Sequence, residues 1–157
     1  MKSLILTPET LRVLEDSVNE YMVETRVKAV LIINTAGQVL FKRGLAKSDN
    51  FVQSVGALSA GIFNATVGLA KLLGDDYFDN IFQEGKKYSL FYSSLNKSTL
   101  LLAVYDKTAL IGVIRVMTKK LTERIGKLMM DEEESTSSEF DSDYKDEVEN
   151  LIDNMFS

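Results

Sequence analysis

The chain has 157 residues, of which 45% are hydrophobic and 26% are charged, as in an ordinary globular domain with one core. The absence of cysteine and histidine excludes disulfides, thiolate metal sites, most zinc sites and histidine-activated nucleophiles. The net charge of −5 is uneven, because residues 131–157 carry eleven acidic groups and one lysine, whereas residues 1–130 carry seventeen basic and twelve acidic groups. The mildly basic body lacks runs of Lys, Arg and aromatic residues, so nucleic acid is not an expected partner.

The first third of the chain predicts a helix followed by a β-hairpin. The helix is expected over residues 7–24, with Thr7 as N-cap and Pro8 at the first helical position. Residues 27–34 are β-branched and apolar, as in a buried strand, and residues 38–43 alternate as the returning strand.

The remaining body predicts a long helix, three further strands and a last helix. The long helix covers residues 51–73, and Gly74 ends it. The expected strands are a short edge segment at 77–82, an alternating one at 87–93 and a buried one at 99–105. The apolar residues of the last helix, expected to face inward, are Leu110, Ile114, Met117, Leu121, Ile125 and Leu128.

This order gives an α/β (α+β sandwich) fold, α-β-β-α-β-β-β-α, with a five-stranded, mainly antiparallel sheet between helices. Residues 1–130 form the domain in this interpretation. Residues 131–143 are acidic and nearly devoid of apolar residues, which predicts a disordered linker. Residues 144–157 then form a C-terminal amphipathic helix that folds when docked, since about 14 residues are marginally helical alone.

The helix over residues 51–73 is unusual because both of its faces are suited to burial. Lys71 is its only charged residue. The large residues expected to cover the sheet are Phe51, Val55, Leu58, Ile62, Leu69, Leu72 and Leu73. The small residues expected on the opposite, partner-facing side are Gly56, Ala57, Ala60, Gly61, Asn64 and Gly68. Since each helical glycine costs about 1 kcal/mol relative to alanine, close approach of a second chain is the expected compensation.

The residues argue against several other functions. The helix over 51–73 has the length of a membrane span, but its polar residues argue against insertion. The acidic run lacks the spacing and the glycine of an EF-hand loop, and no phosphate-binding glycine loop is present. We therefore expect no catalytic residue, no metal site and no cofactor, and we expect that the protein is not an enzyme.

Three segments resemble the Roadblock/dynein light-chain family, and within it the bacterial proteins that regulate a small Ras-like GTPase. They are LSAGIFNATVGLAKLLGDDYFDNIFQEG from Leu58 to Gly85, LLLAVYDKTALIGVIRV from Leu100 to Val116, and the terminal VENLIDNMFS. The resemblance covers nearly the whole chain, including the acidic segment and the tail. Such relatives tend to have alanine where this chain has Asn64, whose side chain is larger.

The resemblance implies a cytoplasmic homodimer that binds one GTP-loaded GTPase and accelerates hydrolysis, in the service of cell polarity or motility. It implies that the dimer supplies no arginine finger and instead moves the switch regions of the GTPase until its own groups are aligned. It further implies that the tail helix docks elsewhere on the GTPase and promotes nucleotide exchange.

The residues expected to bind partners are Ala57, Ala60, Gly61, Asn64, Ala65, Gly68, Lys71, Leu72, Leu151, Ile152, Met155 and Phe156. Two other interpretations stay open. A dimeric Roadblock scaffold or light chain would use the same surface without altering hydrolysis. A ligand-sensing domain would require a cavity lined by polar residues, for which the sequence offers no cluster.

Overall fold

A computed structural model describes residues 7–45 and 47–156, with side chains described at 7–45, 47–129, 150, 151 and 153–155. Within these residues the chain forms three helices and five strands. The helices are α1 (Pro8–Thr25), α2 (Asp49–Leu72) and α3 (Ile111–Phe156). The strands are β1 (Ala29–Asn34), β2 (Val39–Gly44), β3 (Asn80–Gln83), β4 (Ser89–Asn96) and β5 (Thr99–Tyr105).

The helix ends follow from local hydrogen bonding. The Thr7 hydroxyl accepts a hydrogen bond from the Thr10 N–H at 3.2 Å, and Ser48 caps α2 in the same way through the Phe51 N–H. At the other end of α1, Arg26 adopts a left-handed conformation with φ 63° and donates its N–H to the Met22 carbonyl. This bond satisfies one of the carbonyls left free at a helix end and turns the chain toward β1.

The sheet has the strand order β2-β1-β5-β4-β3, and all four pairings are antiparallel. The hairpin β1–β2 and the meander β3–β4–β5 are joined where β1 pairs with β5. These two central strands are buried along nearly their whole length, which accounts for their continuous apolar sequences. The expected five-stranded antiparallel sheet is confirmed.

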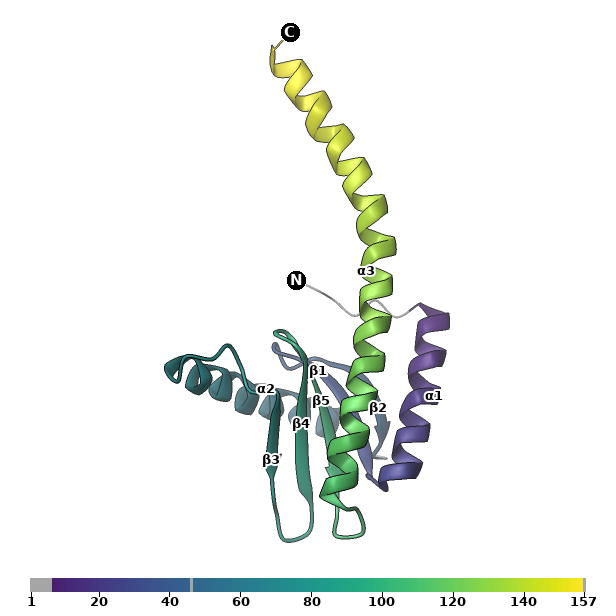
Figure 1. Ribbon diagram of the computed structural model, residues 1–157, viewed down its shortest axis with the longest axis vertical. Coiled ribbons are helices and arrows are strands. Elements are labelled where there is room, and N and C mark those ends of the chain that lie inside the picture. The colour runs from purple at the N-terminus through teal and green to yellow at the C-terminus, as the bar shows by residue number, and fades with distance from the viewer. Residues whose placement is uncertain (1–6, 46, 157) are drawn as a thin grey trace.

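Helices cover both faces of the sheet, with α1 and α3 on one face and α2 on the other (Figure 1). Alternate residues of the central strands point to the two layers. Val30, Ile32 and Leu101 pack with residues of α1 and α3, whereas Leu31 and Leu102 pack under α2. Leu110 does not belong to this core, because it precedes α3 and is exposed, and the prediction that it faces inward is wrong.

The last helix differs from the sequence-based expectation in its length. Helical backbone continues through residues 131–143, where the sequence predicts a linker, so two expected helices are one in the structure. After Gly126 this segment contains neither glycine nor proline, so no residue in it forces the helix to end. Its second half extends beyond the rest of the molecule (Figure 1). The division into body, acidic segment and docking helix stays a prediction.

Candidate partner interface

The outer face of α2 carries a ridge of large apolar side chains exposed to solvent. Leu58 is 70% exposed and Leu72 is 85% exposed. The α2 ridge consists of Phe51, Leu58, Leu69 and Leu72, with Leu73 directly after the helix. Contiguous exposed apolar surface of this kind marks a site of interaction.

The prediction that the large residues cover the sheet is wrong for the ridge and for Leu73, whereas the half-buried Val55 and Ile62 do pack against the core on that side of the sheet. The residues that α2 buries are Val52, Gly56, Ser59, Ala60, Phe63 and Ala70. The inward stripe mixes large and small residues because α2 approaches the β1–β2 turn closely at Gly56. A Cβ placed on Gly56 would lie 2.7 Å from the Gly37 carbonyl oxygen and 2.8 Å from Val39 Cγ2. Gly56 and Ala60 therefore serve the packing of the chain's own domain.

The remaining small residues form an exposed strip beside the ridge, which we call the α2 strip. Its members are Ala57, Gly61, Asn64, Ala65 and Gly68, with the exposed Lys71 one turn further on. A Cβ placed on Gly61 or Gly68 would meet no atom within 4 Å. Most of the residues predicted to bind partners are thus accessible, whereas Ala60 is only 4% exposed.

Asn64 fixes the β1–β2 turn beside the α2 strip. Its side-chain amide donates a hydrogen bond to the Thr35 carbonyl at 3.0 Å. Within the turn, Asn34 Oδ1 accepts hydrogen bonds from the Ala36 and Gln38 N–H groups. The sequence marked Asn64 as a departure from alanine, and the structure assigns it this positioning contact.

The tail forms a second exposed surface. Leu151 and Met155 are 63% and 78% exposed, and Ile152 and Phe156 lie outside the described side chains. These residues occupy the far end of α3, well away from α2 (Figure 1). The two sets of predicted partner residues are therefore not brought together within one chain.

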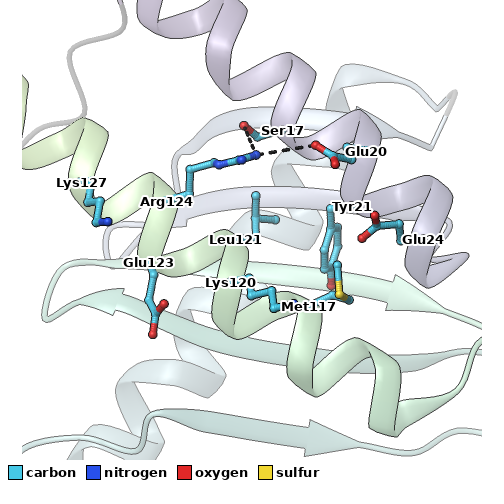
Figure 2. A pocket seen from close by; sticks show the side chains of 10 residues that line it. All are labelled: Ser17, Glu20, Tyr21, Glu24, Met117, Lys120, Leu121, Glu123, Arg124 and Lys127. Carbon is cyan, nitrogen blue, oxygen red and sulfur yellow. Dashed lines mark hydrogen bonds and ion pairs between the residues drawn. The ribbon is translucent and has the colours of Figure 1, made fainter.

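A cleft that the sequence did not reveal lies between α1 and α3. Its volume is about 510 Å³, and Figure 2 shows its lining of Ser17, Glu20, Tyr21, Glu24, Met117, Lys120, Leu121, Glu123, Arg124 and Lys127. Arg124 crosses the cleft, donating to Ser17 Oγ at 3.3 Å and pairing with Glu20 at 3.7 Å. Polar residues gather here only because two helices distant in sequence lie side by side, so spacing along the chain gives no signal for the cleft.

The titratable groups give no sign of chemistry at these surfaces. Burial raises the pKa of Tyr21 to about 12, and its hydroxyl lies 2.7 Å from Thr118 Oγ1. Burial also raises the pKa values of Tyr92 and Tyr105, so all three stay neutral. Among the described residues, no group of three or more His, Cys, Asp or Glu side chains could hold a metal ion.

Of the described helices, α2 is also long and apolar enough to cross a membrane. However, it packs by one face on the sheet, with Phe63 and Ala70 fully buried. Packing therefore accounts for the apolar inner face of α2, and the exposed α2 ridge contributes the rest of its apolar character.

Comparison with known proteins identifies the family to which this fold belongs. Residues 13–106 match the Roadblock/LC7 domain. The chain belongs to the Roadblock/LC7 family. It is similar to the solved MglB of Myxococcus xanthus, with 26% identity, a TM-score of 0.70, and coverage of 76% of this chain and 96% of that one. The gliding protein MglB of Thermus thermophilus has 26% identity, a TM-score of 0.75, and coverage of 83% and 98%.

Another solved structure, described as MglB with tetrameric arrangement, has the same identity, 26%, and a TM-score of 0.75 over 83% of this chain and 98% of that one. An uncharacterised protein of Aquifex aeolicus is 25% identical over 117 residues, which are 74% of this chain and 72% of its own length. These findings establish an MglB-type Roadblock fold.

Proposed function

We propose that this protein is a cytoplasmic, homodimeric regulator of a small Ras-like GTPase of the MglA type and accelerates GTP hydrolysis by that partner. The observation that carries the proposal is the exposed, almost uncharged outer face of α2 in a chain similar to MglB proteins. A role in cell polarity or motility belongs to the same proposal.

The two parts of this face have different roles in the proposal. The α2 ridge packs against the ridge of a second copy, because large apolar side chains gain most from burial. The α2 strip, flanked by the β1–β2 turn, stays accessible and forms the platform for the GTPase. Its small side chains allow the close approach of the GTPase backbone.

Activation proceeds without a group inserted into the active site of the GTPase. The outer face of α2 carries Lys71 but no arginine, so it lacks the side chain of an arginine finger. Phosphoryl transfer depends mainly on positioning and electrostatics. A platform that binds the aligned conformation of the switch regions more tightly shifts the population toward it and raises the hydrolysis rate.

The test is a time course of GTP hydrolysis by the cognate GTPase, with and without this protein. We expect stimulation by the native protein and its loss in Gly68→Arg, which places a long charged side chain on the α2 strip. Because Gly68 has open space around it, the variant should fold. Gly112→Arg is the matched control, since Gly112 is equally unobstructed but lies on α3, across the sheet.

A Roadblock scaffold that binds the GTPase without activating it is the second candidate, favoured by the same surface. It predicts co-purification with the GTP-bound GTPase and an unchanged hydrolysis rate. Equal stimulation by native protein and Gly68→Arg would contradict the assignment of the α2 strip.

A further inference from the structure

The α3 wall of the cleft between α1 and α3 carries two lysines that form no ion pair among the described residues. Arg124 is already engaged with Glu20 and Ser17. Lys120 and Lys127 are exposed on the same wall and, among the described residues, form no ion pair (Figure 2). Glu24 and Glu123 are the other acidic groups of the cleft, and Glu123 lies between the two lysines along α3, so a negative ligand needs enough charge to offset it.

The charge along α3 changes sign abruptly. Residues 111–129 contain five basic groups and one acidic group, whereas residues 131–149 contain ten acidic groups and one lysine. The acidic block 131–149 is therefore opposite in charge to the basic block 111–129. Within one chain, however, the continuous helix carries the acidic block away from the cleft, by about 1.5 Å per residue (Figure 1).

We propose that the acidic segment 131–149 of a second copy of this chain docks along the Lys120–Lys127 wall of the α1–α3 cleft. The contact is reciprocal, because each copy contributes one wall and one acidic segment, as a two-fold symmetric interface requires. It is separate from the α2 face and needs no GTPase. Residues held there are withdrawn from other partners of the tail.

The strength of this contact comes from several exposed pairs acting together. A single exposed ion pair contributes about 0.2–1 kcal/mol, so the interaction requires many of the ten carboxylates. Such pairs are screened by salt. At about 1 M NaCl, where the Debye length is about 3 Å, we expect the contact to be lost.

A zero-length carbodiimide cross-link tests the proposal, because this reagent joins lysine amines to carboxylates in direct contact. The full-length protein is cross-linked at low salt, and the joined peptides are identified by mass spectrometry. We expect Lys120 and Lys127 joined to residues 131–149, with loss of these products at about 1 M NaCl. Their absence at low salt would overturn the proposal.

Two variants decide which copy supplies the acidic segment. The first, Lys120→Glu with Lys127→Glu, removes the wall. The second replaces the ten acidic residues of 131–149 by their amides and removes the charged segment. Each alone should lose the cross-link between wall and segment. Co-expressed, they should regain a cross-link from the intact wall of one to the intact segment of the other.

A control variant with the same charge change tests whether the cross-link depends on the position of the two lysines. Lys86→Glu with Lys87→Glu makes the same charge change between β3 and β4 and should leave the cross-link unchanged. If it also abolishes the cross-link, the attraction is unspecific and the proposal fails. If native protein is cross-linked but the co-expressed pair is not, each chain binds its own segment, and the role of a second copy is refuted. Thermal midpoints within a few degrees of the native value confirm that the variants are folded.

Discussion

Gly56 shows how a single missing side chain sets the distance between two layers of this protein. Its Cα faces the carbonyl of Gly37, which itself has φ 89°, a conformation that favours glycine. The close approach seats the start of α2 on the β1–β2 turn. The same turn flanks the α2 strip, so packing at Gly56 also shapes the proposed platform.

We predict that Gly56→Ala destabilises the protein by about 1–3 kcal/mol, measured as the free energy of unfolding in urea. The added methyl would lie 2.7 Å from a backbone oxygen, and this overpacking outweighs the roughly 1 kcal/mol gained in helix propensity. Gly61→Ala is the matched control. Because its surroundings are open, it should raise stability by about 0.5–1 kcal/mol. Equal stability of the two variants would contradict the close contact.

Tyr21 gives the fold a dependence on alkaline pH. In the unfolded chain the phenol ionises near its ordinary pKa of 10.0, whereas burial in the folded protein raises that pKa to about 12. Between these values the unfolded state binds fewer protons, so the free energy of unfolding must fall as pH rises. Below pH 10 the contribution is fully present.

We predict that Tyr21→Phe makes this alkaline loss shallower between pH 10 and 12, and lowers stability near pH 7 by about 0.5–1.5 kcal/mol through the lost bond to Thr118. Urea unfolding at a series of pH values measures both effects. Tyr88→Phe, at a tyrosine that is 57% exposed, is the control. An identical pH dependence of Tyr21→Phe and native protein would rule out the role of Tyr21.

At the scale of elements, the strands and helices were predictable where local chemistry dictates them. Central strands such as β5 have uninterrupted apolar sequences because they are buried on both faces, and Thr7 with Pro8 marks a helix start. The orientation of α2 was not predictable in this way. The sequence alone does not distinguish an inner stripe that buries Phe63 beside Gly56 and Ala60 from one that buries the leucines, because here the leucines are exposed although they are apolar.

The ridge of α2 supports a prediction about self-association. We predict that Leu72→Asp shifts the homodimer toward monomer while the thermal midpoint changes little, because Leu72 is 85% exposed within one chain. A charge placed in an apolar interface would be buried without a counter-ion. Sedimentation equilibrium measures the mass of the protein in solution.

The control is Val23→Asp, because Val23 is 80% exposed in the last turn of α1. This variant should leave the dimer intact. A native protein that is already monomeric would refute the proposed use of the ridge.

For the molecule as a whole, the long α3 separates two exposed apolar surfaces. The α2 face belongs to the compact body, whereas Leu151 and Met155 lie at the far end of α3 (Figure 1). The resemblance to GTPase regulators of this family implies that these surfaces meet different parts of one GTPase. The tail then acts by tethering, which raises its local concentration at a second site on a GTPase already held by the platform.

We predict that Leu151→Asp with Met155→Asp preserves the proposed homodimer and its stimulation of hydrolysis, but slows nucleotide exchange on the GTPase, which the resemblance implies that the tail promotes. The two side chains are 63% and 78% exposed, and their removal deletes apolar anchors while the fold is untouched. Release of a fluorescent guanine nucleotide from the GTPase measures exchange.

The control is Asn150→Asp with Asn154→Asp, which adds the same charge at the exposed positions directly before Leu151 and Met155. This control should leave exchange at the native rate. If both double variants slow exchange equally, charge near the end of α3 is responsible rather than apolar docking. If neither changes it, the tail has no part in exchange, and its exposed apolar residues must serve another contact.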